Sequence, residues 1–277
     1  MSINQETARF YYRQLFTAEG KDALAYLKKR GLTKETIKHF GLGYASDDFR
    51  RLKNFLKQKG YTETEMVSAG LLCEKDGKTY DRFRNRVMFP IFSEGGEIVG
   101  FAGRALGDYK PKYLNTPETE MFHKRNILYA LNFASKGKTL ILCEGYMDVI
   151  AMHQAGFTNA VASCGTSFTS EHAHLIESVA KRLIIATDAD TAGRNAVKRV
   201  LRVLRECNIS IPVRILQIPL EKAKDPDEFI LKYGAEEFKK YLKGISPFHF
   251  QMNEACGKED IEDIKILLNE FISNRGS

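Results

Sequence analysis

Residues 183–194, LIIATDADTAGR, decide how the C-terminal half of the chain folds. Four apolar residues and a threonine lead into Asp188 and Asp190, and small residues and Arg194 follow them. This pattern predicts a buried strand that ends at the aspartates and a helix that begins near Thr191. Two carboxylates about 4 Å apart repel each other by roughly 4 kcal/mol at an effective dielectric constant near 20. A positive group must therefore offset the two aspartates.

The same alternation of strand and helix surrounds this stretch. Residues 139–145 (TLILCEG) and 159–166 (NAVASCGT) are predicted strands, each followed by a helix, and residues 212–219 (PVRILQIP) form a fourth strand. Thr169 is a candidate N-cap for the helix that precedes the aspartate strand. Short apolar strands that alternate with helices predict a parallel sheet with helices on both faces, which is an α/β fold.

The first half of the chain mixes helices and strands. Residues 5–30 and 50–59 have the apolar spacing of helices, and Thr33 is placed to cap a short helix after them. Residues 86–103 (RVMFPIFSEGGEIVGFAG) predict a β-hairpin, because two apolar runs flank a glycine-rich turn. Pro90 indicates that its strand lies at a sheet edge or in a bulge.

Three parts emerge from these patterns. Residues 1–136 form a basic α+β part, residues 137–243 form the α/β part, and residues 244–277 form a short helical tail with a loose end. The first part holds 24 Lys and Arg against 16 Asp and Glu, whereas the rest holds 18 against 19. This excess predicts a surface that faces a polyanion. An ordinary basic protein surface is the alternative.

The cysteines and apolar stretches exclude several classes of protein. Five scattered cysteines without a C-x-x-C pair argue against a disulfide framework and a zinc ribbon. The N-terminus lacks a signal-peptide pattern, and the longest uncharged stretch, residues 149–170, is too polar to span a membrane. We therefore expect a cytoplasmic protein without a membrane partner. His153, His172 and His174 lack a ligand-like set of neighbours, so we interpret them as structural.

Acidic residues are expected to meet at one edge of the predicted sheet. Glu144 ends one strand, and Asp188 and Asp190 follow another. Ligands of such sheets bind beyond the carboxyl ends of the strands, and neighbouring strands lie about 4.8 Å apart. If the two strands are adjacent, the three carboxylates converge and suit a hard divalent cation such as Mg²⁺. Asp225 and Asp227, after the fourth strand, are second-rank candidates.

Each acidic pair also has an ordinary structural interpretation. Asp190 has the residue type and the position of a helix N-cap, and Asp188 is placed to pair with Arg194. An aspartate before a proline, such as Asp225 before Pro226, is common where a helix starts. The residues alone leave both alternatives open.

Several consecutive motifs resemble one family. EGYMDVIA, DADTAGR and KDPDEF resemble the Toprim module of bacterial DnaG-type primases. In the first half, RFRNRVMFPIF, GFAGRAL, PKYLNTPET and FHKRNILYAL resemble the basic subdomain of the same family in order and spacing. The resemblance covers roughly residues 5–245. It implies a Toprim module with a short parallel sheet flanked by helices, a mixed α+β basic subdomain before it and a short helical tail after it.

The resemblance also implies roles for particular residues. It makes Glu144, Asp188 and Asp190 the metal-binding catalytic acids, and Asp225 and Asp227 auxiliary metal-binding acids. Nucleotide or template binding falls to six further residues: Arg82, Arg84, Arg104, Lys112, Asn115 and Lys124. Whether Glu144 binds metal or accepts the proton of the attacking hydroxyl stays open.

The implied activity is template-directed synthesis of short RNA primers on single-stranded DNA. The resemblance implies nucleoside triphosphates as substrates, Mg²⁺ or Mn²⁺ with more than one ion as cofactor, and a guanosine alarmone as inhibitor. Primases of this type usually also carry a zinc-binding module and a helicase-binding domain, and neither pattern is visible here. We therefore expect an isolated polymerase core, whose contacts with the replicative helicase and the zinc-binding module run through regions absent from this chain.

Two other functions remain as alternatives. A strand that ends in D-x-D also suits an aspartate-nucleophile phosphohydrolase, in which Asp188 would be phosphorylated. That class expects Thr or Val at position 192, where this chain has Ala192, and it gives the basic first half no task. A non-catalytic nucleic-acid-binding module is the second alternative. Loss of an acid would indicate it, and all the acids are present.

Overall fold

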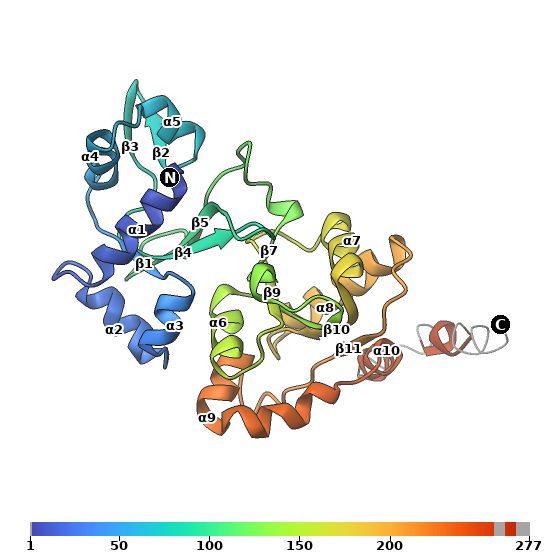
Figure 1. Cartoon of the computed structure of the whole chain (residues 1–277). Coiled ribbons are helices and arrows are strands. Elements are labelled where there is room, and N and C mark those ends of the chain that lie inside the picture. Colours follow the sequence, from blue (N-terminus) through green and yellow to red (C-terminus); the bar gives the residue numbers. More distant parts are fainter. Residues whose placement is uncertain (1, 258–263, 270–277) are drawn as a thin grey trace.

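The structure is a computed structural model that describes residues 2–257 and 264–269, so the predicted loose end at residues 274–277 lies outside the described residues. The chain folds into two halves that lie against each other (Figure 1). The elements of the first half are α1 (Ile3–Leu15), α2 (Lys21–Lys29), α3 (Lys34–His39), β1 (Gly43–Ala45), α4 (Arg51–Gln58), α5 (Glu63–Ser68), β2 (Leu72–Lys75), β3 (Lys78–Asp81), β4 (Arg86–Phe92), β5 (Ile98–Ala105), β6 (Tyr113–Asn115), η1 (Lys124–Asn126), β7 (Leu128–Tyr129) and η2 (Leu131–Phe133).

The second half continues the alternation of strands and helices. Its elements are β8 (Lys138–Cys143), α6 (Tyr146–Gln154), β9 (Ala160–Ser163), α7 (Ser170–Val179), β10 (Ala180–Ala186), α8 (Thr191–Glu206), β11 (Val213–Ile215), α9 (Pro226–Lys239), η3 (Lys240–Lys243) and α10 (Pro247–Cys256). Residues 264–269 are also helical, in agreement with the predicted helical tail.

Side chains that cap helix ends set several boundaries. Thr33 accepts a hydrogen bond from the backbone N–H of Thr36, so it caps α3 as predicted. The helical spacing of residues 5–30 resolves into two helices, because the chain turns between Leu15 and Lys21. A Cβ at Gly20 in that turn would lie 2.3 Å from the Gln14 carbonyl oxygen, so this turn requires glycine.

The sheet of the first half is antiparallel, with the strand order β1-β4-β5-β6. Its central pair, β4 and β5, is the predicted hairpin. Pro90 was expected at an edge or in a bulge; β4 as a whole is not an edge strand, because it lies between β1 and β5, but an irregularity of the ladder does lie beside the proline. The proline is tolerated because β1 pairs with β4 only as far as Met88. The register shifts between Ile91 and Phe92, next to the proline.

The sheet of the second half has the order β11-β10-β8-β9-β7. Four of its strands are parallel, as predicted. The predicted parallel sheet is extended at one edge by an antiparallel strand, where β7 of the first half pairs with β9. Two residues, Leu128 and Tyr129, make this contact, which is too short a pattern to read as a strand from the sequence.

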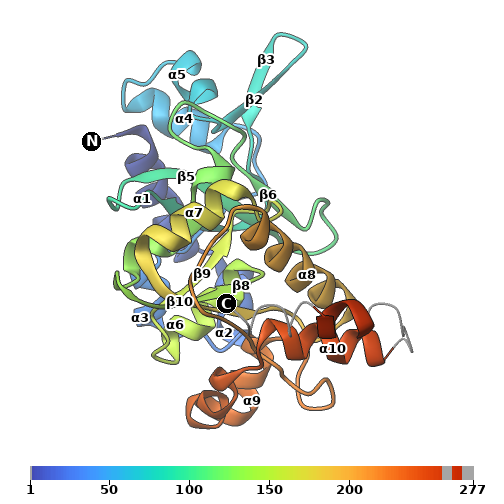
Figure 2. The same ribbon diagram turned by 90° about the vertical axis from the view of Figure 1, so that its right-hand side faces the viewer.

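Helices cover both faces of this mixed sheet (Figure 2). Successive residues of β10 alternate between the two sides, because Leu183 and Ile185 pack with α7 and α8, whereas Ile184 and Ala186 pack with α6 and α9. Both sides are apolar, which explains why the strand is an unbroken apolar run in the sequence.

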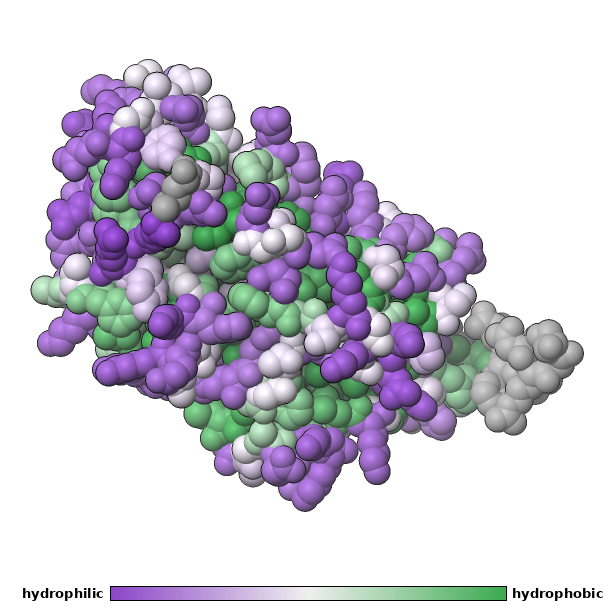
Figure 3. All heavy atoms as spheres, in the orientation of Figure 1, coloured by the Kyte–Doolittle hydropathy of each residue, from purple (hydrophilic) through white to green (hydrophobic). Residues whose placement is uncertain are grey.

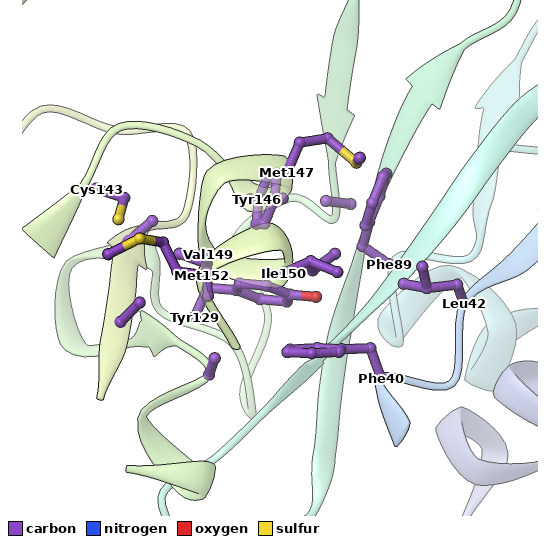
Figure 4. Close-up of a cluster of buried hydrophobic side chains, with 14 of the residues drawn as sticks. Phe40, Leu42, Phe89, Tyr129, Cys143, Tyr146, Met147, Val149, Ile150 and Met152 are labelled. Carbon is purple, nitrogen blue, oxygen red and sulfur yellow. The ribbon is translucent and has the colours of Figure 1, made fainter. Parts of the chain in front are cut away.

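The core on the α6 side continues into the first half (Figure 4). Tyr146 on α6 stacks on Phe89 of β4, with ring centroids 5.7 Å apart, and packs edge-on against Tyr129 at 4.8 Å. Phe40, after α3, in turn stacks on Tyr129 at 6.1 Å. The two halves therefore share one hydrophobic core, with α6 between them.

Hydrophilic side chains cover most of the face seen in Figure 3, and hydrophobic ones form scattered patches. Among the described residues, no helix is both long enough and apolar enough to cross a membrane.

Candidate active site

Two strand ends bring the first pair of acids together. β8 and β10 are adjacent and parallel, with Cys143 opposite Ala186, so the residues just beyond them share one edge of the sheet. The backbone N–H of Asp188 donates a hydrogen bond of 3.0 Å to Oε1 of Glu144. The structure thus brings the Glu144 carboxylate to the loop that carries Asp188.

Two further acids reach the same edge from the starts of helices. Asp190 caps α8 by accepting a hydrogen bond from the N–H of Gly193, and Asp225 caps α9 in the same way. The Nζ of Lys224 lies 3.9 Å from an oxygen of Asp188 and 3.9 Å from one of Asp190. The capping interpretation is therefore right for both acids, and it does not remove them from the cluster.

The suggested pairing of Asp188 with Arg194 is wrong. The Arg194 guanidinium donates to the carbonyl of Ala189 and to the hydroxyl of Thr191, and its Nε lies 3.5 Å from Glu254. Among the described residues, Lys224 is the cation within ion-pair distance of Asp188.

The turn after β10 is tightly packed. A Cβ at Gly193 would lie 1.9 Å from the carbonyl oxygen of Asp188, so this position requires glycine. The N–H of Ala189 donates to the carbonyl of Lys224 at 2.8 Å and joins this turn to the loop before α9. Glycine and small residues after the aspartates thus allow two acidic loops to lie against each other.

Several carboxylates in the cluster hold their protons unusually firmly. Partial burial and the neighbouring Glu144 raise the pKa of Asp188 to about 6. Burial, with help from Asp190, also raises the pKa of Glu144. Asp148 on α6 is buried, and its burial and the charges of Asp225 and Asp188 raise its pKa to about 8. Negative charge is therefore concentrated here beyond what Lys224 compensates.

The cluster forms one wall of a cleft of about 290 Å³, and four cations line the same cleft. Glu144, Asp148, Asp188 and Asp225 contribute the acidic side. The cations are Arg30, Arg104, Lys112 and Lys224. The guanidinium of Arg104 lies over the ring of Tyr26, 4.2 Å from its centroid, which fixes its position.

Asp227 is not brought together with the other acids. Its carboxylate is buried and forms an ion pair with Arg30, which comes from the end of α2. A buried carboxylate requires such a partner, and Asp227 does not line the cleft. Asp227 thus lies apart from the acidic wall, in an ion pair that holds α9 to the end of α2.

The six predicted nucleotide- or template-binding residues are divided among different places. Arg104 and Lys112 line the acidic cleft, whereas Lys124 lines a separate cleft of about 600 Å³ beside the start of α7. Arg82 donates to the carbonyl of Asn115, and Arg84 lies over the ring of Phe49 at 4.5 Å from its centroid.

Asn115 joins the two halves. Its amide donates to the carbonyl of Cys164 at 2.8 Å and accepts from the hydroxyl of Tyr146 at 3.1 Å. A Cβ at Gly165 would lie 2.2 Å from the Asn115 amide nitrogen, so the contact requires glycine there. The Asn115 side chain thus contacts protein groups of the second half rather than the cleft.

Sequence reasoning missed Arg30, Asp148 and Lys224. Lys224 precedes the predicted acids in KDPDEF, and Asp148 lies in EGYMDVIA, so both signals lay inside motifs already recognised. Arg30 is the C-cap of α2, in a region read only as helical. Its role could not be read locally, because its partner lies 197 residues away.

The chemistry of the donor set fits a divalent cation. The acids offer hard carboxylate oxygens, and their mutual repulsion would be relieved by positive charge. As the side chains stand, no three acidic, imidazole or thiol groups in the described ranges form a ready-made metal site. The acidic cluster therefore suits a divalent cation by its charge and by its oxygen donors, without a preformed coordination geometry among the described residues.

Comparisons with known proteins agree with this arrangement. Residues 10–135 match the family described as DNA primase catalytic core, N-terminal domain, and residues 141–230 match the family described as Toprim-like. Domains of the second type are generally metal-dependent. The DNA primase of Clostridium acetobutylicum is 46% identical over 266 residues, which is 95% of this chain and 44% of that protein. The chain thus spans less than half the length of the curated relatives it matches.

Solved structures cover both halves at once. A DNA primase domain from Pseudomonas aeruginosa is 39% identical with a TM-score of 0.83, and the match covers 91% of this chain and 82% of that one. A DnaG primase catalytic domain bound to ssDNA is 36% identical with a TM-score of 0.81, covering 92% and 82%. With the acidic edge of its mixed sheet and a basic first half joined to it, the chain belongs to the family of DnaG-type DNA primase catalytic cores with a Toprim domain.

Proposed function

We propose that this chain synthesises short RNA primers on a single-stranded DNA template from nucleoside triphosphates, as a primase core in the bacterial cytoplasm. The observation that carries the proposal is the cleft in which carboxylates at the carboxyl edge of the sheet face Arg30, Arg104 and Lys112. Acidic and basic groups in one cleft suit a reaction that handles both metal ions and triphosphates.

The acidic wall is assigned to metal binding. Glu144, Asp188, Asp190 and Asp225 would hold Mg²⁺ or Mn²⁺, and more than one ion fits this number of carboxylates. The ions would neutralise charge on the reacting phosphate and lower the pKa of the attacking hydroxyl. Lys224, which lies between Asp188 and Asp190, would turn toward phosphate oxygens when the acids bind cations.

The basic wall is assigned to the incoming triphosphate. Arg30 and Arg104 present forked guanidinium groups that match phosphate oxygens, and Lys112 adds a point charge. Asp227 holds Arg30 by their ion pair, and Tyr26 holds Arg104 by ring contact. These partners fix the two guanidinium groups before substrate arrives, so less entropy is lost on binding.

The template strand is assigned to the basic first half. Its excess of Lys and Arg suits the phosphates of single-stranded DNA, and Arg84 with Phe49 offers a charged and aromatic surface there. We include Arg82 and Lys124 as secondary template contacts. A guanosine alarmone would compete for the triphosphate site, and the replicative helicase and a zinc-binding module would act through segments beyond this chain.

The test is primer synthesis by the wild-type chain and by Asp188→Asn and Glu144→Gln variants, on single-stranded DNA with Mg²⁺ or Mn²⁺. Each variant should lose activity by about 100-fold or more, because several kcal/mol of transition-state stabilisation depend on the acids. Binding of fluorescent single-stranded DNA should stay within about 2-fold of wild type, since the template meets the basic half.

Asp76→Asn serves as the matched control, because it makes the same change in the turn between β2 and β3, outside the lining of the cleft. It should retain full activity. If both acid variants kept wild-type synthesis, the assignment would be wrong. A phosphoryl group trapped on Asp188 would instead support the phosphohydrolase alternative, and template binding without any synthesis would support the binding-module alternative.

A further inference from the structure

Glu144 lies on the wall between two clefts. Besides the acidic cleft described above, it lines a second cleft of about 160 Å³ between α8 and the loop that follows β9. Ser163 lines both clefts as well. A group bound in the second cleft would therefore face the acidic cluster from the side opposite the triphosphate-binding cations.

The two clefts differ in charge. The first contains four cations, which suits a polyphosphate. The second contains a single cation, Arg199, together with hydroxyl groups and an apolar part that includes Phe168 and Val200. The hydroxyls belong to Ser163, Thr166, Ser167 and Thr187. Hydroxyls beside an apolar surface suit a sugar and a base better than a chain of phosphates.

Arg199 is left without an acidic partner. Its guanidinium reaches the hydroxyl of Ser167 at 3.4 Å, and no carboxylate in the described ranges lies within ion-pair distance of it. Other cations on α8 do have such partners: Lys198 lies 2.6 Å from Glu254, and Arg202 pairs with Glu206 on its own helix. Apart from its contact with Ser167, the forked guanidinium of Arg199 therefore has donors to offer a ligand in the second cleft, which it lines.

We propose that the second cleft binds the initiating nucleotide, the one that supplies the first 3′-hydroxyl, and that Arg199 is a binding residue for it. This inference rests on the proposed function. The 3′-oxygen would attack the α-phosphorus of the nucleotide in the cationic cleft. A new P–O bond forms, the bond to the β-phosphate breaks, pyrophosphate leaves, and the hydroxyl proton passes to water. The two substrates would meet at Glu144, which both clefts share.

Thr166 lines both the second cleft and the wide cleft of about 600 Å³, which contains Lys124 and Arg125 together with Glu118, Glu171 and Glu206. Arg125 lies 3.6 Å from Glu171, so acids already balance the cations there. The wide cleft therefore offers no excess of positive charge, and Arg199 is the cation assigned to the 5′-phosphates of the initiating nucleotide.

The experiment separates the first nucleotide from the second. On a template that directs two different nucleotides at the first two positions, the apparent KM of each is measured for dinucleotide formation by the wild-type chain and by Arg199→Ala. The variant should raise the KM of the first nucleotide about 10-fold, because a charge-assisted hydrogen bond is lost. The KM of the second nucleotide and the extension of a pre-annealed RNA primer should stay within about 2-fold, since base pairing holds an annealed primer.

Two variants complete the test. Arg202→Ala removes the same side chain one turn along α8 and should leave both KM values unchanged. Arg199→Lys should recover part of the loss, because it keeps the charge without the fork. Equal effects of Arg199→Ala on both nucleotides, or no effect on the first, would overturn the inference while the proposed function stands. Failure of the wild-type chain to make any product would overturn both.

Discussion

At the scale of single residues, Asp190 combines two tasks that a substitution can separate. Its side chain caps α8 through the N–H of Gly193, and its other oxygen faces Lys224 in the acidic cluster. Asp190→Ala removes both the cap and the charge, whereas Asp190→Ser removes the charge and keeps a good capping group. The alanine variant should be less stable than the serine variant by about 1 kcal/mol in chemical denaturation.

Both Asp190 variants should lose primer synthesis to a similar extent, because both lack the carboxylate. Removing the Asp190 carboxylate also relieves its repulsion with Asp188, which stabilises both variants equally. The difference in stability between the alanine and serine variants therefore reports the cap alone. Equal stability of the two variants would show that the cap contributes nothing. A serine variant with full activity would remove Asp190 from the proposed metal-binding acids.

Single residues also mark where sequence reasoning was strong. The acids of the cluster stood out because several carboxylates that follow neighbouring strands repel one another unless a cation offsets their charge. Arg30 did not stand out, since an arginine at the end of a helix is common and its partner, Asp227, is remote in the sequence. Lys124 was expected to bind nucleotide or template, and its placement in a cleft separate from the acids depends on the fold of the segment after β6.

At the scale of elements, the start of α7 is tied to the segment before it by a buried histidine. The Nε2 of His172 faces the carbonyl oxygens of Lys124 and Ile127, at 3.0 and 3.2 Å, and its Nδ1 faces the Thr169 cap. Burial lowers the pKa of His172 below its ordinary value of 6.5. The histidine is structural, as the sequence suggested.

The lowered pKa of His172 predicts how stability depends on pH. Below about pH 6.5 the unfolded chain binds a proton that the folded His172 resists, so this residue lowers the free energy of unfolding as the pH drops. Asp148 and Asp188 act in the opposite direction, because their raised pKa values let the folded chain bind protons more readily than the unfolded chain. The contribution of His172 is therefore measured as a difference: the melting temperature of His172→Gln relative to wild type should rise as the pH falls from 8 to 5.

His174 provides the matched control for this measurement. It lies on the same helix with an exposed side chain, so His174→Gln should leave the pH profile of the melting temperature unchanged in shape. A difference in melting temperature between His172→Gln and wild type that stays constant from pH 8 to pH 5 would contradict the account of the buried histidine.

Helix boundaries that depend on nearby residues were predicted well from the sequence, whereas strand pairings that depend on distant segments were predicted poorly. Thr33, Thr169 and Asp190 cap their helices as expected, because a cap depends on residues within one turn. The antiparallel β7 was missed because its pairing with β9 is set by the fold of both halves. Pro90 left an edge and a bulge open for the same reason, since the extent of pairing by β1 is not a property of β4.

At the scale of the whole molecule, the ion pair between Arg30 and Asp227 joins the two halves across 197 residues. Arg30→Met should destabilise the protein by about 3 kcal/mol, because it leaves a buried carboxylate without its partner. The double variant Arg30→Met with Asp227→Asn should recover much of this loss, since no charge is then buried. Chemical denaturation of the single and double variants measures the difference.

An exposed pair on the same helix is the comparison for this prediction. Lys232 and Glu228 form an i, i+4 pair on the surface of α9, and Lys232→Met should change stability by no more than about 0.5 kcal/mol. If the double variant were no more stable than Arg30→Met alone, the loss of stability would come from the lost packing of the arginine side chain rather than from the unpaired Asp227 carboxylate.

The core in which α6 contacts both sheets has a consequence for cutting the chain. Position 136 separates two composition patterns, yet Phe40, Phe89 and Tyr129 on one side of it are covered by Tyr146 and its neighbours on the other. A fragment that ended at position 136 would expose a large apolar aromatic surface and would aggregate rather than fold. Dividing the gene at position 136, where the composition changes, would therefore leave neither fragment able to fold.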